Sequence, residues 1–580
     1  MYLQGVKKTI IQRPIAQTTH QLGNIPPLLE RIFLARGLSS AHELDRSLAT
    51  LPSPWLLSGM ETMVLELVGA LTQRQKVSIV ADFDADGATS CVVALRGLQM
   101  LGAQHIDFIV PNRFEYGYGL TPEIVELVKL QRPDLIITVD NGISSIDGVQ
   151  AANAAGIKVL ITDHHLPGAV LPAAAAIVNP NLASDRFPSK SLAGVGVMFY
   201  VLLALRNRLR ENNWFAEQQL PEPNLAQLLD FVALGTVADV VTLDSLNRTL
   251  VHQGLSRIRA GQCHVGIQAL IDVSGKNASA LTPSDLGFSL GPRLNAAGRM
   301  DDMTLGIQCL LTDDADLAKT IALQLDDLNN DRRETEKQMK HEAMSLLADM
   351  RALEAQHLPA GVCLYNAEWH QGVIGILASR LKDRLHRPVI AFAPAGKDSI
   401  KGSARSIVGV HIRDVLSEIA AEHPKLLSKF GGHAMAAGLS LAMHDYPAFA
   451  LAFDQIVSRH LAEVDLEQKV LSDGQLTERE ITLEVADLLQ KSATWGQGFP
   501  EPLFHGVFEV VQARIVGQRH LKMVLRHPGG LLIDAIAFFV DSVEQWLGIR
   551  QVLAAYKLDV NEFRGQRSVQ MIVEYLEKTA

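Results

Sequence analysis

The sequence has few cysteines and no long apolar run. Its four cysteines are scattered without the spacing of a metal site, which favours ordinary buried thiols in a reducing cytoplasm. The longest apolar run, residues 195–205, is too short to span a bilayer. Residues 1–8 lack the apolar core of a signal peptide. We therefore expect a cytoplasmic protein with no membrane segment.

Positive charge is also scarce: the chain has 53 Lys and Arg residues but 63 Asp and Glu residues, which gives a formal net charge of −10. This balance argues against a general nucleic-acid coat, but an enzyme that acts on nucleic acid needs basic groups only locally. The hydrophobic fraction of 48% and the charged fraction of 20% are typical of globular proteins. At 580 residues the chain is too long for one core, so three or four domains are expected.

The most informative stretch is Asp-Phe-Asp-Ala-Asp-Gly at residues 82–87, which follows the apolar run 77–80 and precedes a helical pattern. If the pleat of the strand continues, this spacing directs Asp82, Asp84 and Asp86 to one side. Three like charges so close repel one another unless a cation or protons neutralise them. A solvated turn with Asx caps is the alternative. Three acids favour a divalent metal site, since hard cations prefer oxygen ligands.

Strand and helix patterns alternate beyond residue 75, which predicts a parallel sheet with helices on both faces. Thr121 and Pro122 have the residue types that begin a helix. The expected strands are residues 77–81, 106–111, 135–139 and 157–162, and the expected helices are residues 88–101, 121–130 and 144–155.

Acidic or histidine side chains follow three of these strands. Asp140 comes directly after one strand, and Asp163, His164 and His165 come after the next. Because ligands of open α/β sheets bind beyond the carboxyl ends of the strands, these groups and the acidic triad should converge. Asp239 ends an apolar helix, where an unpaired buried acid would be costly. Two surface or capping histidines are the alternative for the pair, but the preceding strand and aspartate favour a site.

This set of ligands is larger than one divalent ion needs. Two ions about 3.5–4 Å apart, bridged by an aspartate and a water, would use it and would suit phosphoryl transfer. Nitrogen among the oxygens shifts the preference from Mg²⁺ toward Mn²⁺. The expected metal ligands are Asp82, Asp84, Asp86, Asp140, His164 and Asp239.

Four motifs resemble those of the DHH phosphoesterase superfamily in order and spacing. Within that superfamily, further stretches resemble the branch of single-strand-specific 5′→3′ DNA exonucleases. The resemblance covers nearly the whole chain and is weakest before residue 70. The four motifs lie at residues 82–87, 139–142, 163–165 and 235–239, and the further stretches are residues 111–119, 192–196 and 291–300.

Residues 312–358 contain neither Gly nor Pro, which predicts a long helix of up to ~70 Å. A break is expected near residues 329–330. A partner-binding coiled coil is the alternative, but the heptads are not clean. A linker helix between two halves of the protein agrees better with the resemblance.

Strand patterns at residues 361–365 and 388–392 follow the long helix. The small residues at 401–406 predict a loop, whose two cations and two hydroxyls suit phosphate. Together with residues 430–438, this stretch resembles the DHH-associated domain. The resemblance implies that this domain closes over the active site and contacts the substrate.

The pattern changes to short β segments from about residue 467. Leu521, Met523 and Leu525 alternate with polar or cationic neighbours, so one face is apolar and the other cationic. Residues 510–533 contain no acid but include four cations. An ordinary solvated strand face is one interpretation. A single-strand-binding OB barrel that follows a phosphate backbone is the other, and the resemblance favours it.

These features predict an α/β protein with a parallel-sheet DHH domain and a smaller α/β DHH-associated domain, joined by a long helix. A C-terminal β-barrel of the OB-fold type follows. The expected boundaries are 1–60 for an N-terminal helical appendage, 61–311 for the DHH catalytic domain, 312–358 for the linker helix, 359–466 for the DHH-associated domain and 467–580 for the OB domain.

The resemblance implies a metal-dependent exodeoxyribonuclease that acts in DNA repair and recombination with two Mn²⁺ or Mg²⁺ ions. His165 is assigned to the scissile phosphate, as a donor or an electrostatic stabiliser. Asp163 is assigned to orient a neighbouring histidine. From the family, Arg113, Ser403 and Arg405 are candidates for the 5′-terminal phosphate.

The remaining substrate candidates belong to the path of the strand. Tyr118 is a candidate for base stacking, Arg293 and Asn295 for lining the path, and Lys522 and Arg526 for contacts in the OB barrel. The expected partners are single-stranded DNA, a single-strand-binding protein and a helicase. We expect a monomer in the cytoplasm that does not bind a membrane.

Two other function classes stay open. One is a DHH phosphodiesterase of cyclic dinucleotides or short oligoribonucleotides, whose members usually lack an added OB barrel at a position such as residues 467–580. The other is a non-catalytic replication scaffold on the same fold, whose members have lost metal ligands.

Overall fold

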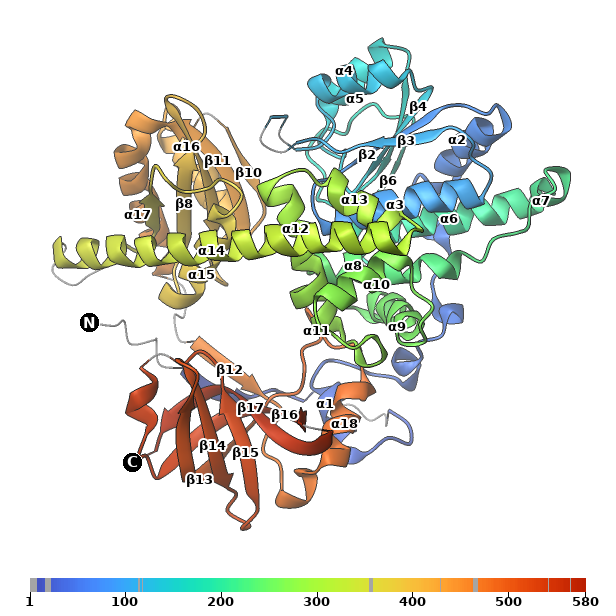
Figure 1. Ribbon diagram of the computed structural model, residues 1–580. Coiled ribbons are helices and arrows are strands. Elements are labelled where there is room, and N and C mark those ends of the chain that lie inside the picture. Colours follow the sequence, from blue (N-terminus) through green and yellow to red (C-terminus); the bar gives the residue numbers. More distant parts are fainter. Residues whose placement is uncertain are drawn as a thin grey trace. The chain divides into compact units, whose positions relative to one another are not determined.

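The computed structural model describes most of the chain. The described residues are 8–15, 22–112, 115–116, 118–353, 358–427, 429–462, 468–540, 542–563 and 565–579. The chain divides into two compact units, one of residues 1–11 with 330–471 and a larger one of residues 12–329 with 472–580. Helix α14 (Ala315–Leu353) runs from one unit into the other (Figure 1).

The larger unit contains a five-stranded parallel sheet in the order β3-β2-β4-β5-β6. Two of its inner strands, residues 77–81 and 135–139, are mostly apolar and are buried along their whole length, as expected for a parallel sheet covered on both faces. The predicted alternation of strands and helices is confirmed. The strands are β2 (Val77–Ala81), β3 (Ile106–Ile109), β4 (Leu135–Val139), β5 (Lys158–Thr162) and β6 (Ala176–Val178).

Helices cover both faces of this sheet (Figure 1). Ile79 of β2 points into the larger hydrophobic core, while the next residue, Val80, points into a second core on the opposite face. Alternation of side chains along the strands produces this division. The larger core includes α3 (Ala85–Met100) and α6 (Gly194–Glu211), and the second includes α4 (Pro122–Gln131) and α5 (Ile146–Ala154).

Further helices extend the larger core. Helix α8 is apolar on all sides and buried, which places it at the centre of the unit. A π-helical turn, η6 (Leu286–Leu290), precedes α12, and such turns are rare and often lie at functional sites. These helices are α1 (Pro27–Leu34), α2 (Met60–Thr72), α7 (Trp214–Glu217), α8 (Leu229–Ala238), α9 (Ser245–Arg259), α10 (Val265–Val273), α11 (Pro283–Asp285), α12 (Gly291–Met300) and α13 (Thr304–Leu311).

No single helix in the described ranges is long and apolar enough to cross a membrane. One bent pair of segments, residues 48–56 and 60–72, meets the criterion together by length and composition alone.

The N-terminal segment is not purely helical, contrary to the appendage of helices that its sequence predicted. Strand β1 (Lys8–Gln12) pairs with β12 (Gln468–Ser472) in a two-stranded sheet. The partner strand lies far along the chain, so local sequence patterns carry no sign of the pairing.

A closed barrel follows in the order β13-β14-β15-β17-β16, which confirms the predicted C-terminal β-barrel. Leu521, Met523 and Leu525 are buried in its interior, while Lys522 is partly exposed and Arg526 is exposed, as the alternation predicted. Helix α18 (Leu483–Ser492) precedes the barrel. The strands are β13 (Phe504–Val516), β14 (His520–Arg526), β15 (Leu532–Ala537), β16 (Gln551–Phe563) and β17 (Gln566–Lys578).

The smaller unit has a mixed five-stranded sheet in the order β10-β11-β9-β8-β7. The prediction of a loop at residues 401–406 is wrong, because residues 399–405 form β9, which pairs on both sides with neighbouring strands. The elements are β7 (Val362–Tyr365), β8 (Val389–Pro394), β9 (Ser399–Arg405), β10 (Lys429–Gly432), β11 (Ala436–Ala442), α15 (Ile374–Leu385), α16 (Ile412–Glu422) and α17 (Tyr446–Leu461).

Helix α14 confirms the long helix that the sequence predicted, but the break predicted near residues 329–330 is wrong. It continues through Asn329 and Asn330, and the Asn329 side chain is fully buried. Two asparagines lower helix propensity only slightly, so the surrounding packing decides the outcome.

Candidate metal centre

The acidic stretch forms the turn between β2 and α3. The pleat does not continue through the three acids, contrary to our expectation, because β2 ends before Asp82 and α3 begins after Asp84. Asp84 caps α3, and its Oδ1 accepts a hydrogen bond from the backbone N–H of Gly87 (3.0 Å). A Cβ at Gly87 would lie 2.4 Å from the backbone oxygen of Asp82, so this tight turn requires glycine. Asp86 then lies in the first turn of the helix.

The N-terminus of α6 holds the Asp86 carboxylate. The backbone N–H of Gly194 donates to Asp86 Oδ2 (2.7 Å), and that of Val195 donates to Oδ1 (3.0 Å). Backbone N–H groups at a helix N-terminus stabilise negative charge. Gly235 of α8 allows the close approach, since a Cβ there would lie 2.9 Å from Asp86 Oδ1. The sequence alone assigned no role to these donors, and only the small residues before an apolar helix hinted at them.

Asp140 follows β4 in a left-handed conformation, with a φ of +62°. Aspartate tolerates this conformation better than most residues. The side chain is buried, and α6 packs against it so closely that a Cβ at Gly194 would lie 2.4 Å from Asp140 Oδ1. The next residue, Asn141, joins β2 to β4, because its Nδ2 donates to the backbone oxygens of Val80 (3.0 Å) and Val139 (2.9 Å).

His164 Nε2 lies where these carboxylates meet. It is 3.1 Å from Asp140 Oδ1 and 4.0 Å from Asp86 Oδ2. Asp239 Oδ2 approaches the same nitrogen to 3.5 Å. Asp239 is the C-terminal cap of α8, where the helix dipole disfavours an acid, so this carboxylate gains from a nearby cation.

Crowding and burial raise the pKa of three carboxylates in this cluster. Burial, with the Asp84 charge as the next contribution, raises the pKa of Asp86 to about 7. Burial and the neighbouring acids hold the pKa values of Asp140 and Asp239 well above the usual range. A cation bound among these groups would remove the repulsion that contributes to these shifts.

The donor atoms fit divalent cations. Asp140 Oδ1 is buried and accepts no hydrogen bond from the residues that the structure describes. Oxygen-rich sites with an imidazole suit Mn²⁺ and, with water, Mg²⁺. Three overlapping groups have ligand atoms within 4.8 Å of one another: Asp140, His164 and His165; Asp86, His164 and Asp239; and Asp82, Asp84 and Asp140. Overlap of this kind suits two ions rather than one.

Asp163 directly precedes the two histidines and orients one of them, His165. Its Oδ1 accepts a hydrogen bond from the backbone N–H of His165 (3.0 Å) and contacts His165 Nδ1 at 2.8 Å. Ile143 N–H donates to its Oδ2 (2.9 Å). Burial opposes the charge of Asp163, but these hydrogen bonds prevail and lower its pKa. Burial likewise opposes protonation of His165, yet the bond to Asp163 raises the pKa of His165 to about 9.

Tyr118 lies beside this pair. Its hydroxyl is 3.2 Å from His165 Nδ1, and its ring contacts the ring of Phe83 edge-on, with centroids 6.2 Å apart. The side chain is 46% exposed, so a ring surface is open to solvent next to the cluster. Base stacking by Tyr118 stays a prediction.

Three further predicted substrate residues are Arg113, Arg293 and Asn295. Arg113 lies outside the described residues. Arg293 is buried, and its guanidinium pairs with Asp326 (2.7 Å). Asn295 Oδ1 accepts a hydrogen bond from the backbone N–H of Ala85 (2.8 Å), so it supports the acidic turn. The described contacts thus give Arg293 and Asn295 internal roles, which sequence reasoning did not anticipate.

Ser403 and Arg405 lie together on β9 of the smaller unit. Arg405 donates from Nη1 to Ser403 Oγ (3.0 Å), and burial lowers the pKa of its guanidinium. Both side chains face Gly375 at the start of α15, since a Cβ at Gly375 would lie 3.0 Å from each. A cation, a hydroxyl and a helix N-terminus form a combination suited to phosphate.

Lys522 and Arg526 lie on the outer face of β14. Lys522 Nζ is 3.0 Å from Asp534, and Arg526 pairs with Glu509 (2.9 Å). Acids on neighbouring strands therefore offset part of the cationic bias that residues 510–533 show in the sequence. Exposed pairs of this kind are weak, so phosphate can compete for the cations.

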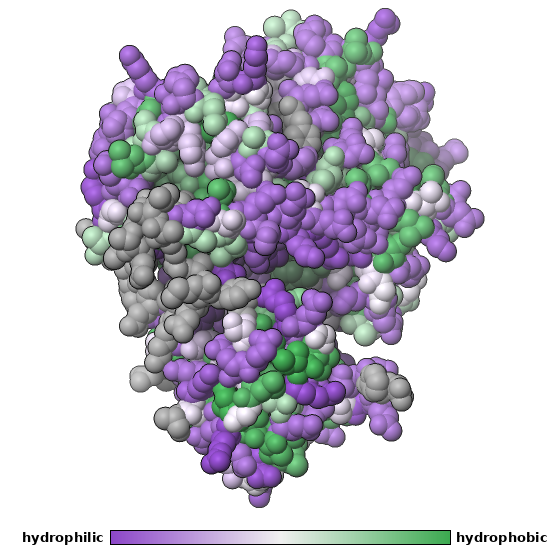
Figure 2. All heavy atoms as spheres, turned by 60° about the vertical axis from the view of Figure 1, so that its left-hand side comes forward, coloured by the Kyte–Doolittle hydropathy of each residue, from purple (hydrophilic) through white to green (hydrophobic). Residues whose placement is uncertain are grey.

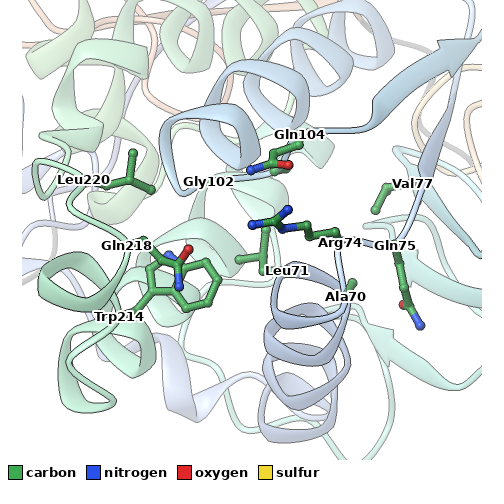
Figure 3. Close-up of a pocket in the computed structure, with 11 residues that line it drawn as sticks. Ala70, Leu71, Arg74, Gln75, Val77, Gly102, Gln104, Trp214, Gln218 and Leu220 are labelled. Carbon is green, nitrogen blue, oxygen red and sulfur yellow. The ribbon is translucent and has the colours of Figure 1, made fainter.

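A small cavity of about 100 Å³ lies elsewhere in the larger unit (Figure 3). Arg74 extends into it toward Trp214 and Gln218. None of the predicted metal ligands lines this cavity, so it is separate from the metal cluster.

Comparison with known proteins agrees with this geometry. Residues 76–236 match the DHH family, N-terminal domain, residues 359–459 the DHHA1 domain, and residues 472–575 the RecJ OB domain. The chain is 52% identical to the single-stranded-DNA-specific exonuclease RecJ of Salmonella typhimurium, over 98% of this chain and 99% of that protein. Identity to the RecJ of Escherichia coli is also 52%, over 97% of this chain and 98% of that protein.

Solved structures give the same result. The crystal structure of RecJ in complex with Mn²⁺ from Thermus thermophilus aligns with a TM-score of 0.78 at 30% identity, covering 96% of this chain and 76% of that chain. The Mg²⁺ complex of RecJ from the same organism aligns with a TM-score of 0.72 at 29% identity, over 96% and 75%. Together with the sheet and the barrel, these matches confirm the predicted fold class.

Proposed function

The chain belongs to the RecJ family of single-stranded-DNA-specific exonucleases, and we propose that it removes nucleotides from the 5′ end of single-stranded DNA during repair and recombination. It is a metal-dependent hydrolase of phosphodiester bonds. The observation that carries the proposal is the convergence of acids from separate chain segments on His164. Cleavage from the 5′ end with release of mononucleotides is the proposed course of the reaction.

We assign the metal-holding role to Asp82, Asp84, Asp86, Asp140, His164 and Asp239. When bound, divalent cations supply Lewis-acid stabilisation of the phosphoryl oxygens and activation of water. Hydrogen bonds distinguish two acids of the first motif. Both oxygens of Asp86 accept backbone N–H groups, whereas Asp84 uses its Oδ1 to cap α3. Asp86 is therefore held rigidly by the backbone. Asp84 keeps its second carboxylate oxygen for a metal ion.

His165 is assigned to the scissile phosphate. Asp163 fixes its ring and stabilises its charged form, so the imidazolium is prepared to donate to a phosphoryl oxygen. Tyr118, whose hydroxyl lies 3.2 Å from His165 Nδ1, is assigned to base stacking with the substrate. Ser403 and Arg405 are assigned to the 5′-terminal phosphate, together with Arg113.

The proposed substrate path ends on the OB barrel, where Lys522 and Arg526 contact the phosphate backbone. A single-strand-binding protein and a helicase that supplies unpaired strands are the proposed partners of a monomeric enzyme. The four cysteines are free, which suits the reducing cytoplasm proposed as its compartment.

The two alternative functions are less well supported. A phosphodiesterase of cyclic dinucleotides or short oligoribonucleotides does not account for the RecJ OB domain at residues 472–575. A non-catalytic scaffold does not account for the clustered carboxylates, three of which, Asp86, Asp140 and Asp239, have raised pKa values.

Digestion of single-stranded and duplex DNA, labelled at either the 5′ or the 3′ end, tests the proposal. We expect immediate release of the 5′ label from single strands with Mn²⁺ or Mg²⁺, no release in EDTA and little from blunt duplexes. Release of mononucleotides from the 3′ end would refute the polarity. Equal cleavage of both DNA forms would refute the strand preference.

A further inference from the structure

One segment of the larger unit, residues 179–195, contacts the surroundings of several proposed metal ligands. It begins directly after β6 and ends in the first turn of α6. Its first residues contact the histidine pair, its middle contacts the beginning of α9, and its last residues supply the two N–H groups that hold Asp86. We call this segment the bracket. It contains none of the proposed ligands, so its contacts act on ligands that other segments carry.

Two asparagines at the start of the bracket hold the backbone of the histidine pair. Asn181 Nδ2 donates to the backbone oxygen of His164 (2.6 Å), and Asn179 Nδ2 donates to that of His165 (2.9 Å). The backbone N–H of Asn181 also donates to Asn179 Oδ1 (2.8 Å), which joins the two asparagines. Asp163 Oδ1 accepts the N–H groups of both histidines. Each histidine is therefore held at its N–H and at its carbonyl.

The amide of Asn179 is fully buried. Polar side chains usually lie at the surface, where water satisfies them, and the face shown in Figure 2 is accordingly mainly hydrophilic. A buried amide is costly unless its hydrogen bonds are made. Asn179 uses both ends of its amide, one on Asn181 and one on His165. A buried polar network whose bonds are made rigidifies the backbone that it joins.

The start of the bracket is itself anchored. Lys190 Nζ donates to the backbone oxygens of Pro180 (2.6 Å) and Asp185 (2.9 Å). Pro180 stands between the two asparagines, and its ring restricts the backbone there. Asp185 Oδ2 accepts the backbone N–H of Ser58 (2.6 Å), which connects the bracket to the segment before α2. The asparagines thus extend from a fixed loop toward the histidines.

The middle of the bracket holds the turn that follows Asp239. Ser189 Oγ donates to Asp244 Oδ2 (2.5 Å), and Asn247 Nδ2 donates to the backbone oxygen of Ser191 (2.6 Å). Asp244 caps the beginning of α9, directly beyond the short turn that starts at the end of α8. The position of Asp239 at the C-terminus of α8 is therefore tied to the same segment that holds the histidine pair.

We propose that the bracket positions the metal ligands, with Asn179 and Asn181 as positioning residues of the histidine pair and Ser189 as a positioning residue of the turn after Asp239. The inference rests on the proposed function and deepens it. A metal site requires its ligands to be held within roughly 0.5 Å of the productive geometry. The histidines follow a strand and Asp239 ends a helix, so one continuous segment that contacts both neighbourhoods sets their spacing.

The test uses the full-length chain with Mn²⁺ alone as the ligand. Asn181→Ala removes the bond to His164 at a partly buried position, and Ser189→Ala removes the bond to Asp244. Asn153→Ala is the matched control, because Asn153 Nδ2 on α5 also donates to a backbone oxygen, that of Ala173 before β6 (2.9 Å). Calorimetric titration measures Mn²⁺ affinity, and mass spectrometry follows backbone hydrogen exchange. Degradation of oligo-dT gives kcat and KM.

We expect Asn181→Ala to weaken Mn²⁺ affinity about 10- to 100-fold and to lower kcat by a similar factor, with KM for oligo-dT within about twofold of the wild type. Hydrogen exchange should accelerate in residues 163–166 and stay unchanged in residues 239–244. Ser189→Ala should also weaken Mn²⁺ binding, but with the opposite exchange pattern. Asn181→Gln keeps the amide donor and should recover part of the lost affinity. Asn153→Ala should change none of these quantities.

Wild-type Mn²⁺ affinity in both Asn181→Ala and Ser189→Ala would overturn the inference. Equal losses in Asn153→Ala, or faster exchange spread over the whole larger unit, would also overturn it, because these side chains would then only stabilise the fold. A raised KM at unchanged kcat would place Asn181 at the substrate instead. Failure of the proposed function is a separate result, in which the wild-type chain binds Mn²⁺ but does not degrade single-stranded DNA.

Discussion

Neutralising Asp140 should stabilise the metal-free protein and abolish its response to divalent cations. Asp140 is only 1% exposed, and burial with the charges of Asp86 and Asp84 holds its pKa well above the usual range. Asp140→Asn removes the charge and preserves the size of the side chain. Asparagine also tolerates the φ of +62° at this position. The backbone of the site should therefore persist while its electrostatics change.

The spacing of the ligand atoms determines how much stability the loss of the Asp140 charge should add. The ligand atoms of Asp82, Asp84 and Asp140 lie within 4.8 Å of one another. Two unit charges at that separation repel by about 3 kcal/mol at an effective dielectric constant of about 20. Relief of one such repulsion corresponds to a rise in Tm of roughly 3 °C, because the entropy of unfolding grows with the number of residues and the larger unit spans residues 12–329 and 472–580. The same repulsion disappears when cations bind, and saturation at about 100 times Kd adds about 2.7 kcal/mol of stability to the wild type.

The effect has a defined pH dependence. An acid whose folded pKa is raised contributes stability below its unfolded pKa and loses that contribution as the pH rises toward the folded value. For Asp86 this window runs from 3.8 to about 7. Asp140 titrates in the same direction, because its pKa is also raised well above the usual value. The advantage of Asp140→Asn in EDTA should therefore be small near the acidic end and largest above neutral pH.

Thermal unfolding in EDTA and in Mn²⁺, at about pH 5 and about pH 8, measures these effects. Asp327→Asn, at an exposed aspartate of α14, is the control and should match the wild type throughout. Asp140→Asn should also lose nuclease activity. A lower Tm than the wild type in EDTA at the higher pH, together with a full Mn²⁺ response, would refute the charge-crowding argument.

Three further outcomes are expected. Binding of Mn²⁺ should release protons into a weakly buffered solution near neutral pH, since carboxylates with raised pKa values must ionise to bind. A pH-stat titration that detects no proton release would contradict this. Gly194→Ala should weaken Mn²⁺ affinity and nuclease activity at least about tenfold, because its Cβ would lie 2.4 Å from Asp140 Oδ1. Gly69→Ala is the control and should leave both unchanged, because Gly69 has open space around it. Asn295→Ala should lower activity more than stability, because the Ala85 N–H loses its acceptor beside the acidic turn; equal activity in a nuclease assay would assign Asn295 a purely structural role.

Local sequence patterns were sufficient to predict the sheet and the convergence of most of the proposed metal ligands. Strands β2, β4 and β5 are short, largely apolar runs, and the aspartate that follows each of them marks the carboxyl end where ligands bind. Asp140 and His164 could be placed this way because sheet topology, not side-chain detail, brings strand ends together. Their separation of 3.1 Å is the consequence.

Features that depend on distant segments were not predictable. The Lys-Gly-Ser-Ala-Arg stretch has the composition of a loop, but the strands on both sides complete β9. Strand β1 depends on its partner β12, far along the chain. Arg293 has the charge of a DNA contact, yet the ion pair with Asp326 explains its burial. In each case a long-range contact overrides the local preference of the residues.

The supports of the metal cluster explain why so unfavourable an arrangement of charge persists in the fold. The N–H groups of α6 compensate Asp86, and the cap of α3 gives Asp84 a favourable position. Asp140 and Asp239 have less support, because one stands in a left-handed conformation and the other at a helix C-terminus. These two carboxylates gain most from bound cations. Metal binding should therefore stabilise the catalytic sheet as a structural element, and the loss of cations should loosen its carboxyl edge before the rest of the unit unfolds.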